Sequence, residues 1–132
     1  MLSCPASVVI GIGLDLVETA RVEQALARYG DRFVRKLMDD EEAGALPSEP
    51  AARALAVAFA VAGKEAASKA LGTGWSQGVR WRDVVVSPGP PASARLLARA
   101  AEVARGLGSS GRSRLRLERR GALVIGELWL LS

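Results

Sequence analysis

The stretch PAARALAVAFAVAGKEAASKALGTG, residues 50–74, decides the fold. A proline in the first turn and a Gly-Thr-Gly at the end predict a helix from Pro50 to about Leu71. Its first half is apolar on nearly every face, which predicts a central, buried helix. Polar side chains enter only in the last two turns, where i, i+4 spacing is expected to place them on one side of the helix end: Lys64, Glu65, Ser68 and Lys69.

The residues before this helix predict one strand and several shorter helices. The run SVVIGIGLDL, residues 7–16, is apolar and β-branched, which predicts a buried strand that ends at Asp15. Over residues 18–29 apolar side chains recur at helical spacing and leave Arg21 and Arg28 on a shared basic face. A short helix is expected over residues 32–37, and Asp39 or Asp40 is expected to cap another.

The residues after the long helix predict a strand at 82–87, a loop at 87–91 and an amphipathic helix at 92–107. Two further strands are expected at 114–120 and 121–131, joined by a turn near Arg120 and Gly121. Helices and strands in this order predict an α+β fold, in which a small antiparallel sheet packs on the long buried helix. The length of 132 residues suits a single domain over residues 1–132.

Composition excludes several kinds of site. Cys4 is the only cysteine and there is no histidine, so an internal disulfide and a multi-cysteine zinc site are impossible. No apolar run is long enough to span a membrane, and the chain is expected to be cytoplasmic. The net charge is +4, but no basic run is interleaved with aromatic residues, so nucleic acid is not an expected partner.

Two carboxylates stand at the edges of apolar segments, where an ionised group needs a cation, a metal or several donors: Asp15 and Glu65. Simple structural roles would be a salt bridge from Glu65 to Lys69 and a helix cap for Asp15. Two carboxylates together with water and phosphate oxygens would instead suit Mg²⁺. A metal-dependent nuclease would use the same two carboxylates, and a cleavage assay with Mg²⁺ tests that alternative.

Three segments carry a family resemblance. GIGLDLVETARV at residues 11–22 and KEAASKALGTG at residues 64–74 resemble the two signature motifs of the holo-acyl-carrier-protein synthases, and about 40 residues separate them. GVRWRDVVV at residues 78–86 has the same family character. The resemblance implies the 4′-phosphopantetheinyl transferase fold and a homotrimer with active sites at the subunit boundaries. It also implies Mg²⁺-dependent transfer of 4′-phosphopantetheine from coenzyme A to a serine of an acyl carrier protein.

The resemblance also implies roles for individual residues. Asp15 and Glu65 would be the Mg²⁺ ligands, and Lys69 would lie near the transferred phosphoryl group. Four residues of the second motif would help to hold coenzyme A: Lys64, Ser68, Gly72 and Thr73. Arg21 matches a family arginine, and a basic surface of three arginines would dock the carrier protein: Arg21, Arg28 and Arg32.

The chain departs from the family pattern in its penultimate strand. The family has a Ser-x-Ser/Thr-His motif there, whereas this chain has Arg116, Glu118 and Arg119. Ala60 also stands where an arginine is common. Two interpretations follow: Arg116 and Arg119 take over contacts to coenzyme A, or the chain is a non-catalytic scaffold that binds carrier proteins or partner subunits. Retention of Asp15, Glu65 and Lys69 favours the transferase.

Overall fold

The computed structural model describes residues 7–132, and Cys4 lies outside this range. The strands are β1 (Val9–Glu18), β2 (Val84–Ser87), β3 (Ser93–Leu96), β4 (Ser113–Arg120) and β5 (Leu123–Leu131). The helices are α1 (Thr19–Tyr29), α2 (Asp31–Leu37), α3 (Asp40–Gly44), α4 (Pro50–Leu71), α5 (Ala98–Gly106) and a short 3-10 helix η1 (Trp81–Asp83). The predicted α+β class is therefore confirmed. No helix among the described residues is both long and apolar enough to cross a membrane.

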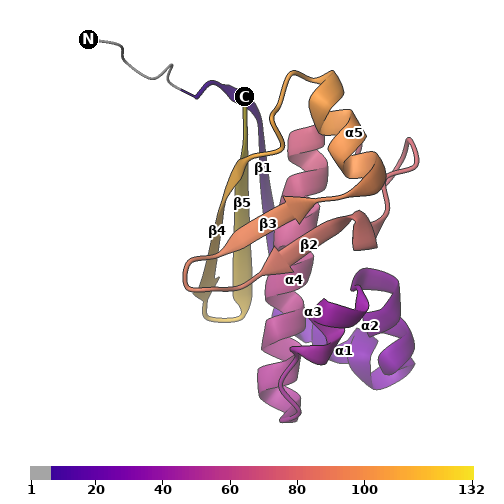
Figure 1. Ribbon diagram of the computed structural model, residues 1–132. Coiled ribbons are helices and arrows are strands. Elements are labelled where there is room, and N and C mark those ends of the chain that lie inside the picture. The colour runs from indigo at the N-terminus through magenta and orange to yellow at the C-terminus, as the bar shows by residue number, and fades with distance from the viewer. Residues whose placement is uncertain (1–6) are drawn as a thin grey trace.

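Helix α4 is the centre of the molecule. It runs between a three-stranded antiparallel sheet, in the order β1-β5-β4, and the β2–β3 pair, with α1, α2 and α3 beside its N-terminal half (Figure 1). The predicted start and end are confirmed, because Pro50 begins the helix and Gly72 caps it with a φ of 78°. The first motif, at the end of β1 and the start of α1, lies against the helix that carries the second motif.

Glycines allow the sheet to lie directly on the backbone of α4. A Cβ at Gly13 would stand 1.7 Å from the carbonyl oxygen of Ala66, and one at Gly126 would stand 2.4 Å from that of Ala62. No side chain fits between backbones that are this close. Because Asp15 follows Gly13 by two residues on the same face of β1, this contact fixes the carboxylate against the last turns of α4.

The prediction that the first strand is buried was wrong for one of its faces. Ile12, Leu14 and Leu16 are 57%, 54% and 60% exposed. They alternate with the inward residues of β1, and helix α4 covers only the inward side of the sheet. Trp129 of β5 pairs with Ile12 and extends the same exposed apolar face.

The predicted helix at residues 92–107 was too long at its start. Residues Ser93–Leu96 form β3, which pairs antiparallel with β2, and the helix begins only at Ala98. Pairing with a neighbouring strand overrode the local helical preference of these residues. The last two strands were predicted correctly in type and order.

Candidate active site

The sequence motifs meet at a cavity of about 510 Å³ between the end of β1, helices α1 and α2, and the C-terminal half of α4. Four charged side chains that the sequence singled out line it together: Asp15, Arg21, Glu65 and Lys69. Val17, Val22, Phe33 and Val61 provide apolar walls. Low-dielectric walls strengthen the interactions among these charges relative to water.

Asp15 and Lys69 form an ion pair across the β1–α4 contact. The Lys69 ammonium donates to Asp15 Oδ1 at 2.7 Å and to the main-chain oxygen of Leu14 at 3.0 Å. Asp15 lies within β1, so it caps no helix. Neither of the simple structural roles is present, because Lys69 pairs with Asp15 and not with Glu65.

Glu65 is half-buried beside this pair. Burial raises the pKa of its carboxyl group above the ordinary value of 4.5, and the negative charge of Asp15 acts in the same direction. The indole N–H of Trp75 and the ammonium of Lys69 act in the opposite direction and lower that pKa. Within residues 7–132 the Glu65 carboxylate makes no ion pair or hydrogen bond of ordinary geometry, so its oxygens remain available to a ligand.

Asp15 and Glu65 together suit a hard divalent cation. Carboxylate oxygens are the ligands that Mg²⁺ prefers, and Mg²⁺ usually keeps water and substrate oxygens in the rest of its shell. The part of the chain that the structure describes has no group of three or more side chains able to hold a metal. A two-carboxylate site that is completed by water and phosphate fits this donor set.

The three arginines of the predicted docking surface are separated by the structure. Arg21 lines the cavity from the first turn of α1. Arg28 is exposed at the other end of the helix, where its guanidinium lies 5.4 Å from the centre of the Tyr29 ring. Arg32 is exposed in the first turn of α2. Only Arg21 can therefore touch a ligand in the cavity.

Lys64 and Ser68 do not face the cavity, which corrects their predicted contact with coenzyme A. The Lys64 side chain is 0% exposed, and its ammonium donates to Glu42 Oε1 at 3.0 Å, to Trp81 O at 3.1 Å and to Val84 O. The buried Ser68 hydroxyl donates to Glu65 O at 2.8 Å. Successive helical residues turn by about 100°. The Lys64–Ser68 row therefore points to the core while Glu65 and Lys69 face the cavity.

The remaining predicted residues lie outside the cavity. Gly72 and Thr73 end α4, and the Thr73 hydroxyl donates to Gly74 O at 2.8 Å. Arg116 and Arg119 lie on β4, and β5 separates this strand from β1. Two strand spacings, about 10 Å in total, therefore separate these arginines from the strand of Asp15. A single chain does not bring the arginines of β4 to the carboxylates.

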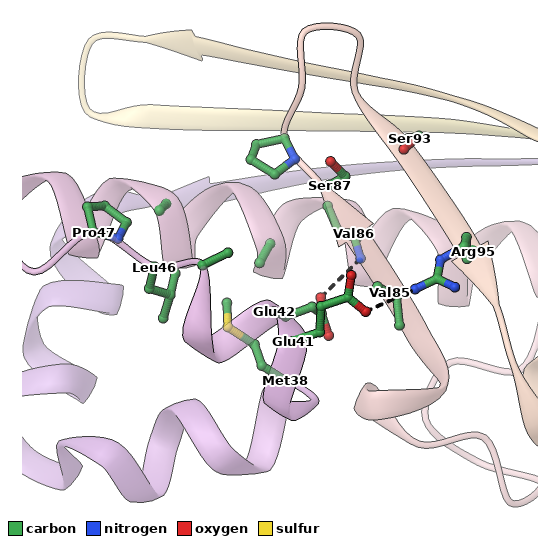
Figure 2. Close-up of a pocket in the computed structure, with 14 residues that line it drawn as sticks. Met38, Glu41, Glu42, Leu46, Pro47, Val85, Val86, Ser87, Ser93 and Arg95 are labelled. Atoms are coloured by element: carbon green, nitrogen blue, oxygen red, sulfur yellow. Dashed lines mark hydrogen bonds and ion pairs between the residues drawn. The ribbon is translucent and has the colours of Figure 1, made fainter.

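A larger cavity of about 590 Å³ lies on another side of α4, between α3, β2 and β3 (Figure 2). Its charged groups already have partners. Glu42 accepts from Val86 N at 3.0 Å, and Arg95 pairs with Glu41 at 3.6 Å, as Figure 2 shows. We assign the active site by its available carboxylates and not by volume, so the smaller cavity is the candidate.

Two residues that support the structure around α4 were missed in the sequence. Glu42 is the partner of Lys64, and its signal was the Asp39-x-x-Glu42 capping box, in which Glu42 N donates to Asp39 Oδ1 at 2.8 Å. Trp75 follows the Gly-Thr-Gly turn and stacks on Trp81 with ring centres 4.0 Å apart. No local pattern marks Trp75, because its neighbours come from the tertiary fold.

Comparison with known proteins gives a consistent result. Residues 11–114 match the family model of the 4′-phosphopantetheinyl transferase superfamily. The holo-[acyl-carrier-protein] synthase of Acidithiobacillus ferrooxidans is 38% identical over 121 residues, which cover 89% of this chain and 94% of that protein. The corresponding protein of Alkalilimnicola ehrlichii is 51% identical over 81 residues, 60% of this chain and 62% of that protein.

Three relatives that are 49% to 51% identical, the protein of Alkalilimnicola ehrlichii among them, are matched over less than two thirds of their own length, from 57% to 62%. Among solved structures, a holo-(acyl-carrier-protein) synthase from Bacillus anthracis, in complex with CoA (3′,5′-ADP), has a TM-score of 0.69 and 25% identity. That similarity covers 96% of this chain and 99% of the other.

Proposed function

Because the chain belongs to the 4′-phosphopantetheinyl transferase superfamily, we propose that it is a holo-acyl-carrier-protein synthase, which transfers 4′-phosphopantetheine from coenzyme A to a serine of an acyl carrier protein. The observation that carries this proposal is the convergence of Asp15, Glu65 and Lys69 on one cavity. These residues come from two motifs that about 40 residues separate, and a scaffold protein has no evident use for two carboxylates that face one cavity.

In this proposal Asp15 and Glu65 hold Mg²⁺, which supplies neutralisation of charge on the pyrophosphate of coenzyme A. Lys69 already lies 2.7 Å from Asp15, and its exposed ammonium can bind a phosphate oxygen at the same place. The serine oxygen of the carrier protein forms the new bond to the β-phosphorus, and the bond to 3′,5′-ADP breaks. A water held by a carboxylate accepts the serine proton, so no histidine is required.

The carrier protein would dock on α1 and α2. Arg28 and Arg32 are exposed and present positive charge to an acidic surface, while Arg21 reaches into the cavity. This division gives the exposed arginines a role in association and Arg21 a role nearer the transferred group. Exposed charges of this kind mainly raise the rate of association, and salt weakens their effect.

A homotrimer would cover the exposed apolar face of the sheet. Ile12, Leu14, Leu16 and Trp129 form a continuous uncovered surface, and such a surface is a common mark of an interface. A boundary between copies could also bring Arg116 and Arg119 of one copy to the cavity of the next. The arginines of β4 would then bind coenzyme A phosphates in place of the family's serine and histidine.

The test is mass spectrometry of an apo acyl carrier protein after incubation with this protein, coenzyme A and Mg²⁺. We expect the carrier to gain the mass of one phosphopantetheine group, and EDTA should abolish the gain. Asp15→Asn and Glu65→Gln should each slow transfer on the order of 10²-fold or more, because several kcal/mol of charge stabilisation are lost. No gain with any of several carriers, from a protein folded by circular dichroism, would favour the non-catalytic scaffold.

A further inference from the structure

Trp75 carries a buried donor that no group satisfies. Its indole Nε1 is inaccessible to solvent and has no hydrogen-bond partner within residues 7–132. A buried N–H without a partner costs about 1–3 kcal/mol, so native proteins rarely keep one without a reason. The ring itself is held firmly, because it stacks on Trp81 with ring centres 4.0 Å apart and an interplanar angle of 19°.

The turn after α4 brings Trp75 back beside the candidate active site. Gly72 N donates to Lys69 O at 3.0 Å, and Gly74 N donates to Ser68 O at 3.2 Å. The chain therefore reverses at the end of α4, and Gly74 lies beside Ser68, whose hydroxyl donates to Glu65 O. The Glu65 carboxyl responds to this donor, because the indole N–H of Trp75 is among the groups that lower its pKa.

The position of the stack is set from its other side by the buried ion pair. The Lys64 ammonium donates to Trp81 O at 3.1 Å, and Glu42 holds that ammonium at 3.0 Å. These bonds hold the main chain at Trp81, and the ring of Trp81 stacks on that of Trp75. The indole N–H is thus a buried donor in a firmly packed ring, and Glu65 is a carboxyl group on which it acts.

We propose that Trp75 is a positioning residue for Glu65, whose carboxylate accepts the indole N–H through one oxygen and thereby turns the other oxygen toward Asp15 and a bound divalent cation. This inference rests on the proposed metal-binding role of Glu65. Groups that orient a metal ligand from behind typically change metal affinity by about 10- to 100-fold when removed. A tryptophan that only fills space would have no such effect.

The test compares Trp75→Phe with Trp81→Phe. Both variants keep an aromatic ring in the stack, but only the first removes the donor beside Glu65. Mg²⁺ affinity is measured without coenzyme A, by competition with Mn²⁺ followed by electron paramagnetic resonance. We expect Trp75→Phe to weaken Mg²⁺ binding by about 10- to 100-fold and Trp81→Phe to leave it unchanged, with both variants folded by circular dichroism.

A second readout observes the contact itself. In the ¹H–¹⁵N NMR spectrum, the indole signal that disappears in Trp75→Phe belongs to Trp75. In metal-free protein this signal should move in the isosteric variant Glu65→Gln, and in the wild type it should move again on addition of Mg²⁺. The inference would be overturned if the indole signal did not move in either case, or if Trp75→Phe bound Mg²⁺ as tightly as the wild type. If only the proposed function were wrong, the loss of Mg²⁺ affinity and the movement of the indole signal would both be observed, but no phosphopantetheine would be transferred.

Discussion

Replacing Lys64 by methionine removes the cation of a buried ion pair while nearly keeping the volume of the side chain. Lys64 is 0% exposed, and the Glu42 side chain beside it is 4% exposed. Burial lowers the pKa of Lys64 below its ordinary value of 10.5, whereas the charge of Glu42 raises it. The charged lysine is therefore tolerated because of its partner, and the partner depends equally on the lysine.

The expected cost can be worked from these contacts. Without Lys64, Glu42 keeps the N–H groups of Asp39 and Val86 as donors but remains a buried carboxylate without a cation. Breaking a buried pair by removing one partner typically costs about 3–5 kcal/mol. The total stability of a domain is only about 5–15 kcal/mol, so Lys64→Met should unfold at a much lower urea concentration.

A double mutant and a matched control make the prediction specific. Lys64→Met combined with Glu42→Gln should be more stable than Lys64→Met alone, because the neutral amide oxygen still accepts from Val86 N and no unpaired charge remains. Lys36→Met makes the same chemical change at an exposed position of α2 and should stay within about 0.5 kcal/mol of the wild type. Urea denaturation measures all four proteins.

Two results would refute this reasoning. If Lys64→Met lost less than about 1 kcal/mol, the pair would not be the buried structural contact that the distances indicate. If the same variant stayed stable but its KM for coenzyme A rose sharply, Lys64 would face the ligand, as the family resemblance implied. An unchanged KM in the folded fraction of the variant supports a purely structural role.

Gly13→Ala should cost about 1–3 kcal/mol or more and slow transfer, because the new Cβ would lie 1.7 Å from a carbonyl oxygen of α4; Gly44→Ala, where nothing lies within 4 Å, is the control in thermal melts. The raised pKa of Glu65 means that the folded protein binds its proton more tightly than the unfolded chain, so stability falls as pH rises from 4.5 through that pKa. In EDTA, the stability of Glu65→Gln relative to the wild type should therefore rise with pH between 4.5 and the raised pKa, and it should stay constant below pH 4.5. A stability difference that does not change with pH would contradict the raised pKa of Glu65. Leu14→Asp should convert an oligomer to a monomer in sedimentation velocity, while Leu97→Asp, an exposed leucine outside the apolar face, should not; an oligomer that survives Leu14→Asp would place the interface elsewhere.

Two features of this protein follow from the sequence alone: the long helix and the residues of the candidate active site. Pro50 and Gly72 act on the backbone next to them, so the ends of α4 could be predicted without any tertiary contact. Asp15, Glu65 and Lys69 stood out because charge beside apolar sequence needs compensation and because the two motifs resemble a known family. The structure then placed all three on one cavity.

Tertiary contacts, in contrast, decide which of two neighbouring polar residues faces the candidate site. Lys64 and Glu65 are adjacent in the chain, but the helix turns one toward Glu42 and β2 and the other toward Asp15. The exposed face of β1, the strand at Ser93–Leu96 and the position of Trp75 likewise depend on contacts with other segments of the chain. Local sequence fixes backbone conformation at caps and turns, whereas the direction a side chain faces acquires meaning only when other elements pack around it.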